Sequence, residues 1–453
     1  MWRSHVRWLR DVIYLGGHSV LHNWSSSMDS NVASGNANGD MNHLSRRRLL
    51  ELSMAAGLTI FGTAACGTRP DGNAAMPPGA GDGEAAQNVP QVNAPPPNGI
   101  LGANFNGDPS IMTWDGLQQA GATWVRGFAE MPDLDKQNAA DNPAVKTLLE
   151  AAGRKYGTVL SLKFPYFPRS HKQIPRPGTD AMKADLARLD KVLPLVMDRV
   201  DILVIGNEPF IECPEADWNN GAINDFYETV ADYIIQYRAE SFPQCKTVLY
   251  MGSLNHLDDP KWTGTGTDNW MKYVRGKAEI EGTDIHPHVA DPNGAQAYLD
   301  YILPKLGSKK FLATEFSLVQ LWKDHLADQV SAEYADKYKV PKGTRVWQVI
   351  KSALNEPFPK ERWYDFLRTS PWFENNKNYL SEQMKKFRDT GKLAVATYGV
   401  GQDAAMSGSD FGPDSTPWLL NSLFASATIK KNPDGAAVPN YAWIEEFKAL
   451  QKH

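Results

Sequence analysis

Two glutamates in this sequence each follow a short apolar run. Glu208 comes after the run 202–205 and lies in the segment Asn207-Glu208-Pro209, and Glu315 comes after the run 310–314. Two carboxyl groups on either side of one bond can divide the work of breaking it, because the protonated one assists the leaving group while the ionised one attacks. This is the chemistry that cleavage of a glycosidic bond requires, so we expect the two glutamates to form a catalytic pair.

Other charged or hydrogen-bonding residues also follow apolar runs. Arg126 ends the run Thr123–Arg126, and His286 and His288 follow the run 280–285. A cation such as Arg126 near Glu315 would favour the ionised carboxylate and lower its pKa. The alternatives are a buried ion pair unconnected with chemistry for Arg126, and a pair of hydrogen-bonded loop residues for the histidines. Further residues of this kind, for which either interpretation is open, are Asn104, Asn106, Lys163, Tyr166, Asn255 and His256.

Eight short apolar runs alternate with longer segments of helical period. Near-continuous apolar runs are typical of parallel strands covered on both faces, and the segment 222–241 repeats its apolar residues with helical spacing. Strand and helix repeated eight times predict an α/β fold, the (β/α)8 TIM barrel. A doubly wound open sheet shares this alternation, but no Gly-x-Gly-x-x-Gly follows the first run. The predicted strands are 100–104, 123–126, 158–162, 201–205, 246–251, 280–285, 310–314 and 392–397.

The barrel would bring the candidate residues together at one rim. The carboxyl ends of barrel strands carry the active site, and the fourth and seventh strands face each other across the mouth. The segment 316–391 also leaves from this rim, and we expect a mainly helical insertion that forms a lid or a subsite wall. The alternative is an addition that covers only outer helices. Its tryptophans are Trp322, Trp347, Trp363 and Trp372.

Asn-Glu-Pro after the fourth strand together with Glu after the seventh resembles the signature of clan A retaining glycoside hydrolases, over roughly residues 99–450. The resemblance implies that Glu208 is the acid/base, that Asn207 binds the sugar 2-hydroxyl and that Glu315 is the nucleophile. It also implies a carbohydrate substrate and no cofactor. A second Asn-Glu-Pro at 355–357 follows no strand-like run, so we do not assign it to the site.

Two positions depart from the pattern of the clan, whereas Arg126 and His286 resemble clan positions. His288 stands where many relatives carry a tyrosine that hydrogen-bonds the nucleophile, and Tyr398 stands where the clan often places a tryptophan as the floor of the sugar subsite. The departures leave two alternatives open: a non-catalytic carbohydrate-binding surface lipoprotein, and a degenerate barrel kept as a scaffold. A binding protein would have no use for glutamates at both strand ends.

The N-terminal region reads as a targeting segment. Residues 45–50 carry three arginines before an apolar stretch that ends at Cys66, which resembles a twin-arginine export signal followed by a lipoprotein cleavage site. Thr63 departs from that pattern, where a Leu is usual. We therefore expect an exported protein at the periplasm or cell surface, with Cys66 available for a lipid anchor. The expected organisation is an upstream extension or mis-assigned start at 1–40, the signal at 41–66, a Pro/Gly/Ala-rich linker at 67–98 and the catalytic domain at 99–453.

The composition of the chain limits which partners, disulfides and metal sites can be expected. A net charge of -5 and an isoelectric point near 6.1 give no reason to expect nucleic acid as a partner. Three cysteines are too few for a disulfide framework, and Cys213 and Cys245 could form one disulfide or remain separate thiols. The ten histidines show no His-x-x-x-His with an acidic partner, so no metal site is predicted. We expect a monomer.

Overall fold

The computed structural model describes residues 97–170, 172–408 and 410–452. The expectations for the upstream extension, the export signal, Cys66 and nearly all of the linker lie outside the described residues. Within the described part, every helix is too short or too polar to cross a membrane.

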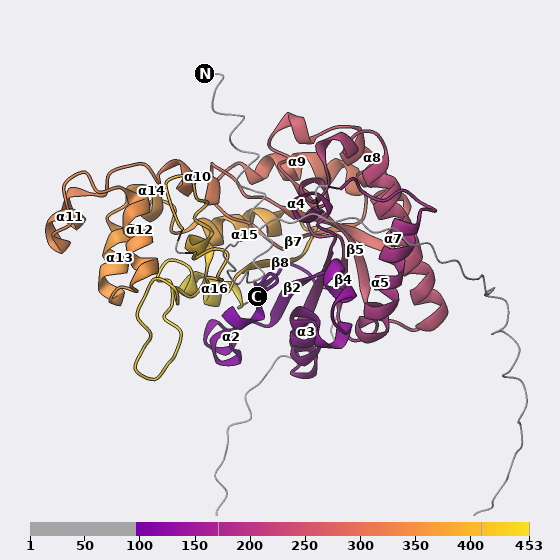
Figure 1. Cartoon of the computed structure of the whole chain (residues 1–453), viewed down its shortest axis with the longest axis horizontal. Coiled ribbons are helices and arrows are strands. Elements are labelled where there is room, and N and C mark those ends of the chain that lie inside the picture. Colours follow the sequence, from indigo (N-terminus) through magenta and orange to yellow (C-terminus); the bar gives the residue numbers. More distant parts are fainter. Residues whose placement is uncertain (1–96, 171, 409, 453) are drawn as a thin grey trace, which may run out of the picture. The chain divides into compact units, whose positions relative to one another are not determined.

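Eight parallel strands form a closed barrel in the order β1 to β8 (Figure 1). This confirms the predicted (β/α)8 barrel. All eight predicted runs are strands, and the main difference is length, because β2 and β5 continue four residues further toward the rim. The strands are β1 (Ile100–Asn104), β2 (Trp124–Glu130), β3 (Gly157–Lys163), β4 (Ile202–Ile205), β5 (Val248–Asn255), β6 (Ile280–His286), β7 (Lys310–Ala313) and β8 (Leu393–Gly399).

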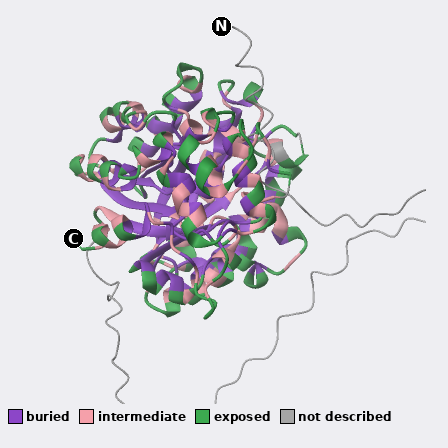
Figure 2. Cartoon of the chain, turned by 90° about the vertical axis from the view of Figure 1, so that its left-hand side faces the viewer, coloured by how far each residue is buried: buried purple, intermediate pink, exposed green. Residues whose placement is uncertain are grey.

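Helices cover the outside of the barrel, and the strands are buried beneath them (Figure 2). The predicted helix at 222–241 is α7 (Ala222–Ser241), which buries Phe226, Val230 and Ile234 as its spacing indicates. A separate apolar cluster, with members such as Val204 and Leu312, fills the barrel interior. The other helices of this layer are α2 (Trp114–Ala120), α3 (Pro143–Gly153), α5 (Asp180–Val196), α8 (Thr265–Gly276), α9 (Ala295–Leu306), α15 (Tyr379–Asp389) and α16 (Ile444–Leu450).

Short helices occupy the loops between these elements. They are α4 (Tyr166–Ser170) and α6 (Pro209–Glu212), with the 3-10 helices η2 (Pro109–Ile111), η3 (Met131–Asp135), η4 (Ala139–Asp141), η5 (Glu215–Asp217), η6 (Pro260–Trp262) and η7 (Trp418–Asn421). Of these, α6 follows β4 directly and η7 follows β8, so both lie in loops of the rim that carries the candidate site.

The segment between β7 and β8 is mainly helical, as predicted. Figure 1 shows its middle helices, in orange, extending to one side of the barrel. Trp322 and Trp363 are fully buried, and Trp322 packs against Phe373 and Trp443, so these side chains fill the core of the insertion. Glu356, in the second Asn-Glu-Pro, is exposed at the end of α12. The helices before α15 are α10 (Val319–Asp324), α11 (Ala332–Tyr338), α12 (Val346–Asn355), α13 (Lys360–Arg368) and α14 (Pro371–Glu374).

A second long segment, residues 400–440, follows β8 and was not singled out from the sequence. It contains little regular structure, but a backbone hydrogen bond from Leu423 N to Gly399 O at 2.9 Å ties it to the end of β8, and one from Phe424 N to Val400 O at 3.1 Å lies directly beyond that end. The folding back of this segment brings η7 to the rim of the barrel.

The two cysteines of the barrel are separate thiols. Cys213 is buried after α6, and Cys245 is half-buried before β5, where its Sγ accepts a hydrogen bond from Asp198 N at 3.2 Å. Of the two alternatives left open by the sequence, the structure therefore supports the unpaired one.

Candidate active site

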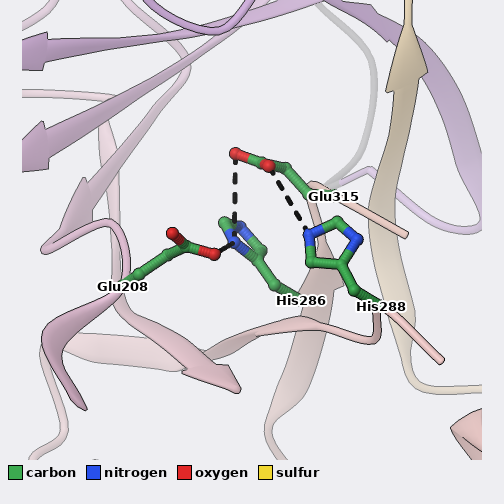
Figure 3. Close-up of side chains that lie close together, drawn as sticks. All are labelled: Glu208, His286, His288 and Glu315. Atoms are coloured by element: carbon green, nitrogen blue, oxygen red, sulfur yellow. Dashed lines mark hydrogen bonds and ion pairs between the residues drawn. The ribbon is translucent and has the colours of Figure 1, made fainter. Parts of the chain in front are cut away.

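The barrel brings Glu208 and Glu315 together at the carboxyl ends of β4 and β7 (Figure 3). One carboxylate oxygen of each lies within 4.8 Å of the other. Their side chains are 20% and 17% exposed, so both are largely desolvated yet open to a ligand. The turn that carries Glu208 needs a glycine at Gly206, because its φ is +108° and a Cβ there would lie 2.1 Å from Gly252 O.

Arg126 is completely buried and ties β2 to this pair. Its Nη1 donates to Glu315 Oε1 at 2.5 Å, and its Nη2 donates to Asn207 Oδ1 at 2.6 Å and to Ser161 Oγ at 3.1 Å. Burial alone would raise the pKa of Glu315, but the charges of His286 and Arg126 hold that pKa well below its usual range. Glu315 is therefore ionised at neutral pH, as a nucleophile must be.

His286 lies between the two carboxylates. Its Nδ1 is 3.1 Å from Glu208 Oε1 and 3.9 Å from Glu315 Oε1 (Figure 3). Burial alone would lower the pKa of this imidazole, but the charge of Glu315 and hydrogen bonds to Asp284 and Glu208 raise the pKa to about 10. The ring is therefore an imidazolium at neutral pH, and its Nδ1 lies closer to Glu208 than to Glu315.

The far side of the His286 ring is anchored in the barrel. Its Nε2 lies 2.9 Å from Ser253 Oγ and 2.9 Å from Thr314 Oγ1, and 3.5 Å from Asp284 Oδ2. Asp284 also accepts a hydrogen bond from Ser253 Oγ at 2.7 Å. Because a buried carboxylate stands behind the ring, both the orientation and the charge of His286 are stabilised. Asp284 was not predicted as a site residue from the sequence, and the available signal is its position two residues before His286 on β6.

Glu208 accepts a second hydrogen bond from the neighbouring strand. Asn255 Nδ2, at the end of β5, donates to Glu208 Oε1 at 2.8 Å. Burial raises the pKa of Glu208, whereas the hydrogen bond from His286 lowers it, and the net result is a pKa below the usual value. In the free protein the shared proton therefore resides on His286 rather than on Glu208, which differs from the expected protonated acid.

His288 lies beside Glu315, with Nε2 3.7 Å from Glu315 Oε2. Its Nδ1 is 2.8 Å from Ser317 Oγ, and the ring meets Trp418 edge to face at a centroid distance of 4.7 Å. The expected proximity of His288 to the predicted nucleophile is thus present. Trp418 comes from the segment after β8, and it was not predicted from the sequence because no strand-like run directly precedes it.

Asn207 and Asn104 both lie in the buried network around Arg126. Asn104 is 4% exposed, and its Oδ1 accepts hydrogen bonds from Arg126 Nη1 at 3.3 Å and from Asn106 N at 2.8 Å. Asn207 Nδ2 donates to Glu212 Oε1 at 3.1 Å. Glu212 was not predicted as a site residue from the sequence. The available signal is its position four residues after Glu208, which is one helical turn further along α6.

Tyr398 is not brought to the site, and this corrects the expectation that it forms a subsite floor. The ring is 1% exposed and packs against Phe316 and Trp443, and its hydroxyl donates to Asn421 Oδ1 at 3.4 Å. Successive residues of a strand point to opposite faces, and Tyr398 is on the face that meets the outer helices.

The remaining residues predicted at the rim are Lys163, Tyr166 and His256, and each contacts a different set of neighbours. Lys163 Nζ is 3.6 Å from Glu130 Oε1 and 4.5 Å from the centroid of the Phe128 ring. Tyr166 donates its hydroxyl to Asp185, a carboxylate of α5. The ring of His256 packs against Trp262 with centroids 4.4 Å apart, and burial lowers the pKa of His256 to about 4, so this ring is neutral.

Four side chains of the site have the donors that a metal ion would need. Ligand atoms of Glu208, His286, His288 and Glu315 all lie within 4.8 Å of one another. Imidazole nitrogens with carboxylate oxygens suit Zn²⁺ and similar ions. Arg126, a permanent positive charge, already occupies one side of Glu315, with Nη1 2.5 Å from Glu315 Oε1. No metal site was predicted from the sequence, because the histidines show no His-x-x-x-His spacing with an acidic partner.

Neither a protein-family model nor a curated protein matches this chain. Solved structures do match over the barrel. GH10 from Paenibacillus barcinonensis is 11% identical, with 79% of this chain and 97% of that chain covered and a TM-score of 0.42. A β-glucosidase from Exiguobacterium marinum is 8% identical, with 78% and 97% covered and a TM-score of 0.43. A glycoside hydrolase family 5 mannosidase from Rhizomucor miehei is 13% identical, with 79% and 94% covered and a TM-score of 0.35.

Proposed function

We propose that this protein is a retaining glycoside hydrolase with Glu315 as nucleophile and Glu208 as acid/base. The observation that carries the proposal is the separation of the carboxylates, which have one oxygen each within 4.8 Å. Retaining enzymes place the two carboxyl groups about 5–5.5 Å apart, whereas inverting enzymes leave roughly 6.5–9.5 Å for a water molecule. The short separation therefore favours direct attack by a carboxylate.

In the first step, Glu315 attacks the anomeric carbon and forms an ester with the sugar, while the glycosidic C–O bond breaks. The leaving oxygen takes a proton from Glu208. Glu208 gains this proton from His286 Nδ1, 3.1 Å away, by transfer along their hydrogen bond. The transfer neutralises an ion pair, which is favoured once a bound sugar excludes water from the site.

In the second step, Glu208 takes a proton from water, and the water oxygen attacks the anomeric carbon from the face that the leaving group vacated. The ester bond breaks and Glu315 returns as a carboxylate, which Arg126 stabilises. Glu208 then passes the proton back to His286 Nδ1 along their hydrogen bond, which restores the starting state. Two inversions give net retention of configuration. Asn207, held beside Arg126, is the proposed partner of the sugar 2-hydroxyl.

An exported location belongs to the same proposal. The predicted twin-arginine signal and a lipid anchor at Cys66 would place the enzyme at the periplasm or cell surface, where polysaccharides are encountered. Cell fractionation would test the anchor separately from the enzyme activity. The full chain should be found in the membrane fraction, and the Cys66→Ala variant should be released from it.

The experiment that tests the function measures sugar release from a panel of polysaccharides and aryl glycosides. Glu315→Gln should abolish release, and Glu208→Gln should lower it by about 10²- to 10⁴-fold, the usual contribution of a general acid. Glu356→Gln, in the exposed second Asn-Glu-Pro, is the matched control and should keep wild-type activity. Sugar binding without turnover in the wild type would favour the binding lipoprotein instead.

A further inference from the structure

We propose that Glu212 is a positioning residue that fixes the orientation of the Asn207 side-chain amide and so aims one Nδ2 hydrogen at the 2-hydroxyl of the bound sugar. The inference rests on the proposed function, because it assigns a task within the same site. Glu212 itself lies beneath the rim, 2% exposed, and does not take part in the two chemical steps.

The two ends of the Asn207 amide meet partners of opposite character. Oδ1 accepts from Arg126 Nη2 at 2.6 Å, and Nδ2 donates to Glu212 Oε1 at 3.1 Å. A guanidinium can only donate and an ionised carboxylate can only accept, so the amide has one permitted orientation. Glu212 uses one of the two Nδ2 hydrogens, and the other has no acceptor among the described residues. That hydrogen is the one that we assign to the ligand.

Glu212 also holds the backbone from which the acid/base projects. Its Oε1 accepts a second hydrogen bond from Glu208 N at 3.1 Å, and its Oε2 accepts from Phe164 N, just beyond β3, at 3.2 Å. Three donors thus converge on one carboxylate. The two carboxylate oxygens join the ends of β3 and β4 to the residues that contact the sugar.

A glutamine at this position could not make the same contacts. Its NH2 group would meet either Phe164 N or the pair of donors at Oε1, and each is a donor. Rotation of the Asn207 amide to relieve this would turn its own NH2 group toward Arg126. Every arrangement of Glu212→Gln therefore leaves two donors facing each other, although the side chains are equal in size.

The pH of the test is chosen from the pKa of Glu212, which depends on its burial and on the charged groups around it. Lys163 and Glu208 face it from β3 and from the loop after β4. Burial raises the pKa of Glu212 to about 7, with Lys163 acting in the opposite direction. The fully accepting carboxylate is therefore present above neutral pH, and kinetics at pH 8 report on it.

The test compares kcat/KM for an aryl glycoside that the wild type cleaves with kcat/KM for its 2-deoxy counterpart. Glu212→Gln should lower kcat/KM for the parent glycoside by about 10- to 100-fold, a range like that for losing an outer partner of a metal ligand. The loss on the 2-deoxy substrate should be much smaller, because the hydroxyl that Asn207 would contact is missing. An equal loss on both substrates would overturn the proposal.

Asp201→Asn is the matched control. Asp201 also joins β3 to β4, by accepting from Thr158 N at 2.8 Å and Thr158 Oγ1 at 3.0 Å, but at the opposite end of the barrel. A purely structural effect of losing such a carboxylate would appear equally on both substrates in this variant. The crystal structure of Glu212→Gln gives a readout without turnover. The Asn207 amide should have moved away from residue 212 or from Arg126, and an unmoved amide would contradict the proposal even if the wild type cleaves no glycoside.

Discussion

Arg126 and Glu315 are 189 residues apart in the chain, yet Nη1 of the one lies 2.5 Å from Oε1 of the other across the barrel. The same guanidinium contacts Asn207, so one buried cation stabilises the ionised Glu315 carboxylate and orients Asn207, the residue proposed to bind the sugar. A fully buried cation with these partners is costly to disturb, because its removal takes away the partner nearest to the Glu315 carboxylate.

Substitutions of Arg126 should distinguish the effect of its positive charge from the effect of its hydrogen-bond geometry. Arg126→Met should lower the free energy of unfolding by about 3–5 kcal/mol, the cost of breaking a buried ion pair on one side. Arg126→Lys keeps the charge but cannot donate to Glu315 and Asn207 as a planar fork does. Its free energy of unfolding should therefore be closer to the wild-type value than its kcat/KM is. Urea unfolding and steady-state kinetics measure the two. Wild-type kcat/KM in Arg126→Lys would show that the fork geometry is unimportant.

Azide should distinguish the roles of the two glutamates. In Glu208→Ala, azide can attack the glycosyl ester from the vacated face, so the product from an activated aryl glycoside should be a glycosyl azide of retained configuration. In Glu315→Ala, azide takes the place of the nucleophile and should give the inverted azide. NMR of the products identifies the anomer. Exchanged outcomes would exchange the two assignments.

The raised pKa of His286 predicts how stability depends on pH. The folded-state value of about 10 lies above the value of about 6.5 for an unperturbed histidine, so the stabilisation is complete below pH 6.5 and is lost as the pH rises toward 10. Unfolding by urea at pH 6.5 and at pH 9.5 should show the decrease. His286→Gln should reduce the difference, and an unchanged difference would mean that His286 is not the charged group.

Metal ions should inhibit rather than support activity. The proposed mechanism uses only side chains, so treatment with a chelator should leave kcat/KM unchanged. Added Zn²⁺ should inhibit, since four donors of the site lie within 4.8 Å of one another. His288→Ala removes one donor and should raise the Zn²⁺ concentration needed for half inhibition. Loss of activity on chelation, with recovery on adding metal, would contradict the carboxylate mechanism.

Substitutions of Trp418 and Tyr398 should affect different properties, KM for Trp418 and stability for Tyr398. Trp418→Ala removes the ring that packs against His288 and should raise KM. Tyr398→Phe removes one buried hydroxyl that bonds Asn421 and should cost about 1 kcal/mol of stability with KM unchanged. Kinetics and unfolding of both variants test this, and an increased KM in Tyr398→Phe alone would restore the expectation made for it from the sequence.

The sequence was sufficient for the barrel and for the position of the two carboxylates. Apolar runs of four to six residues and helical spacing are local properties, so β4, β7 and α7 could be located without tertiary information. Glu208 and Glu315 followed from these runs, because the residues after parallel strands must lie at one rim. Their roles remain a proposal.

Only the tertiary structure decided which other residues belong to the site. Glu212 and Asp284 matter because carboxylates from α6 and β6 reach Asn207 and His286, and such contacts depend on side-chain direction. Trp418 reaches His288 because an irregular segment folds back over the rim, and irregular segments have no period from which to locate them. The sequence by itself determined where the strands end, and packing decided which side chains meet beyond those ends.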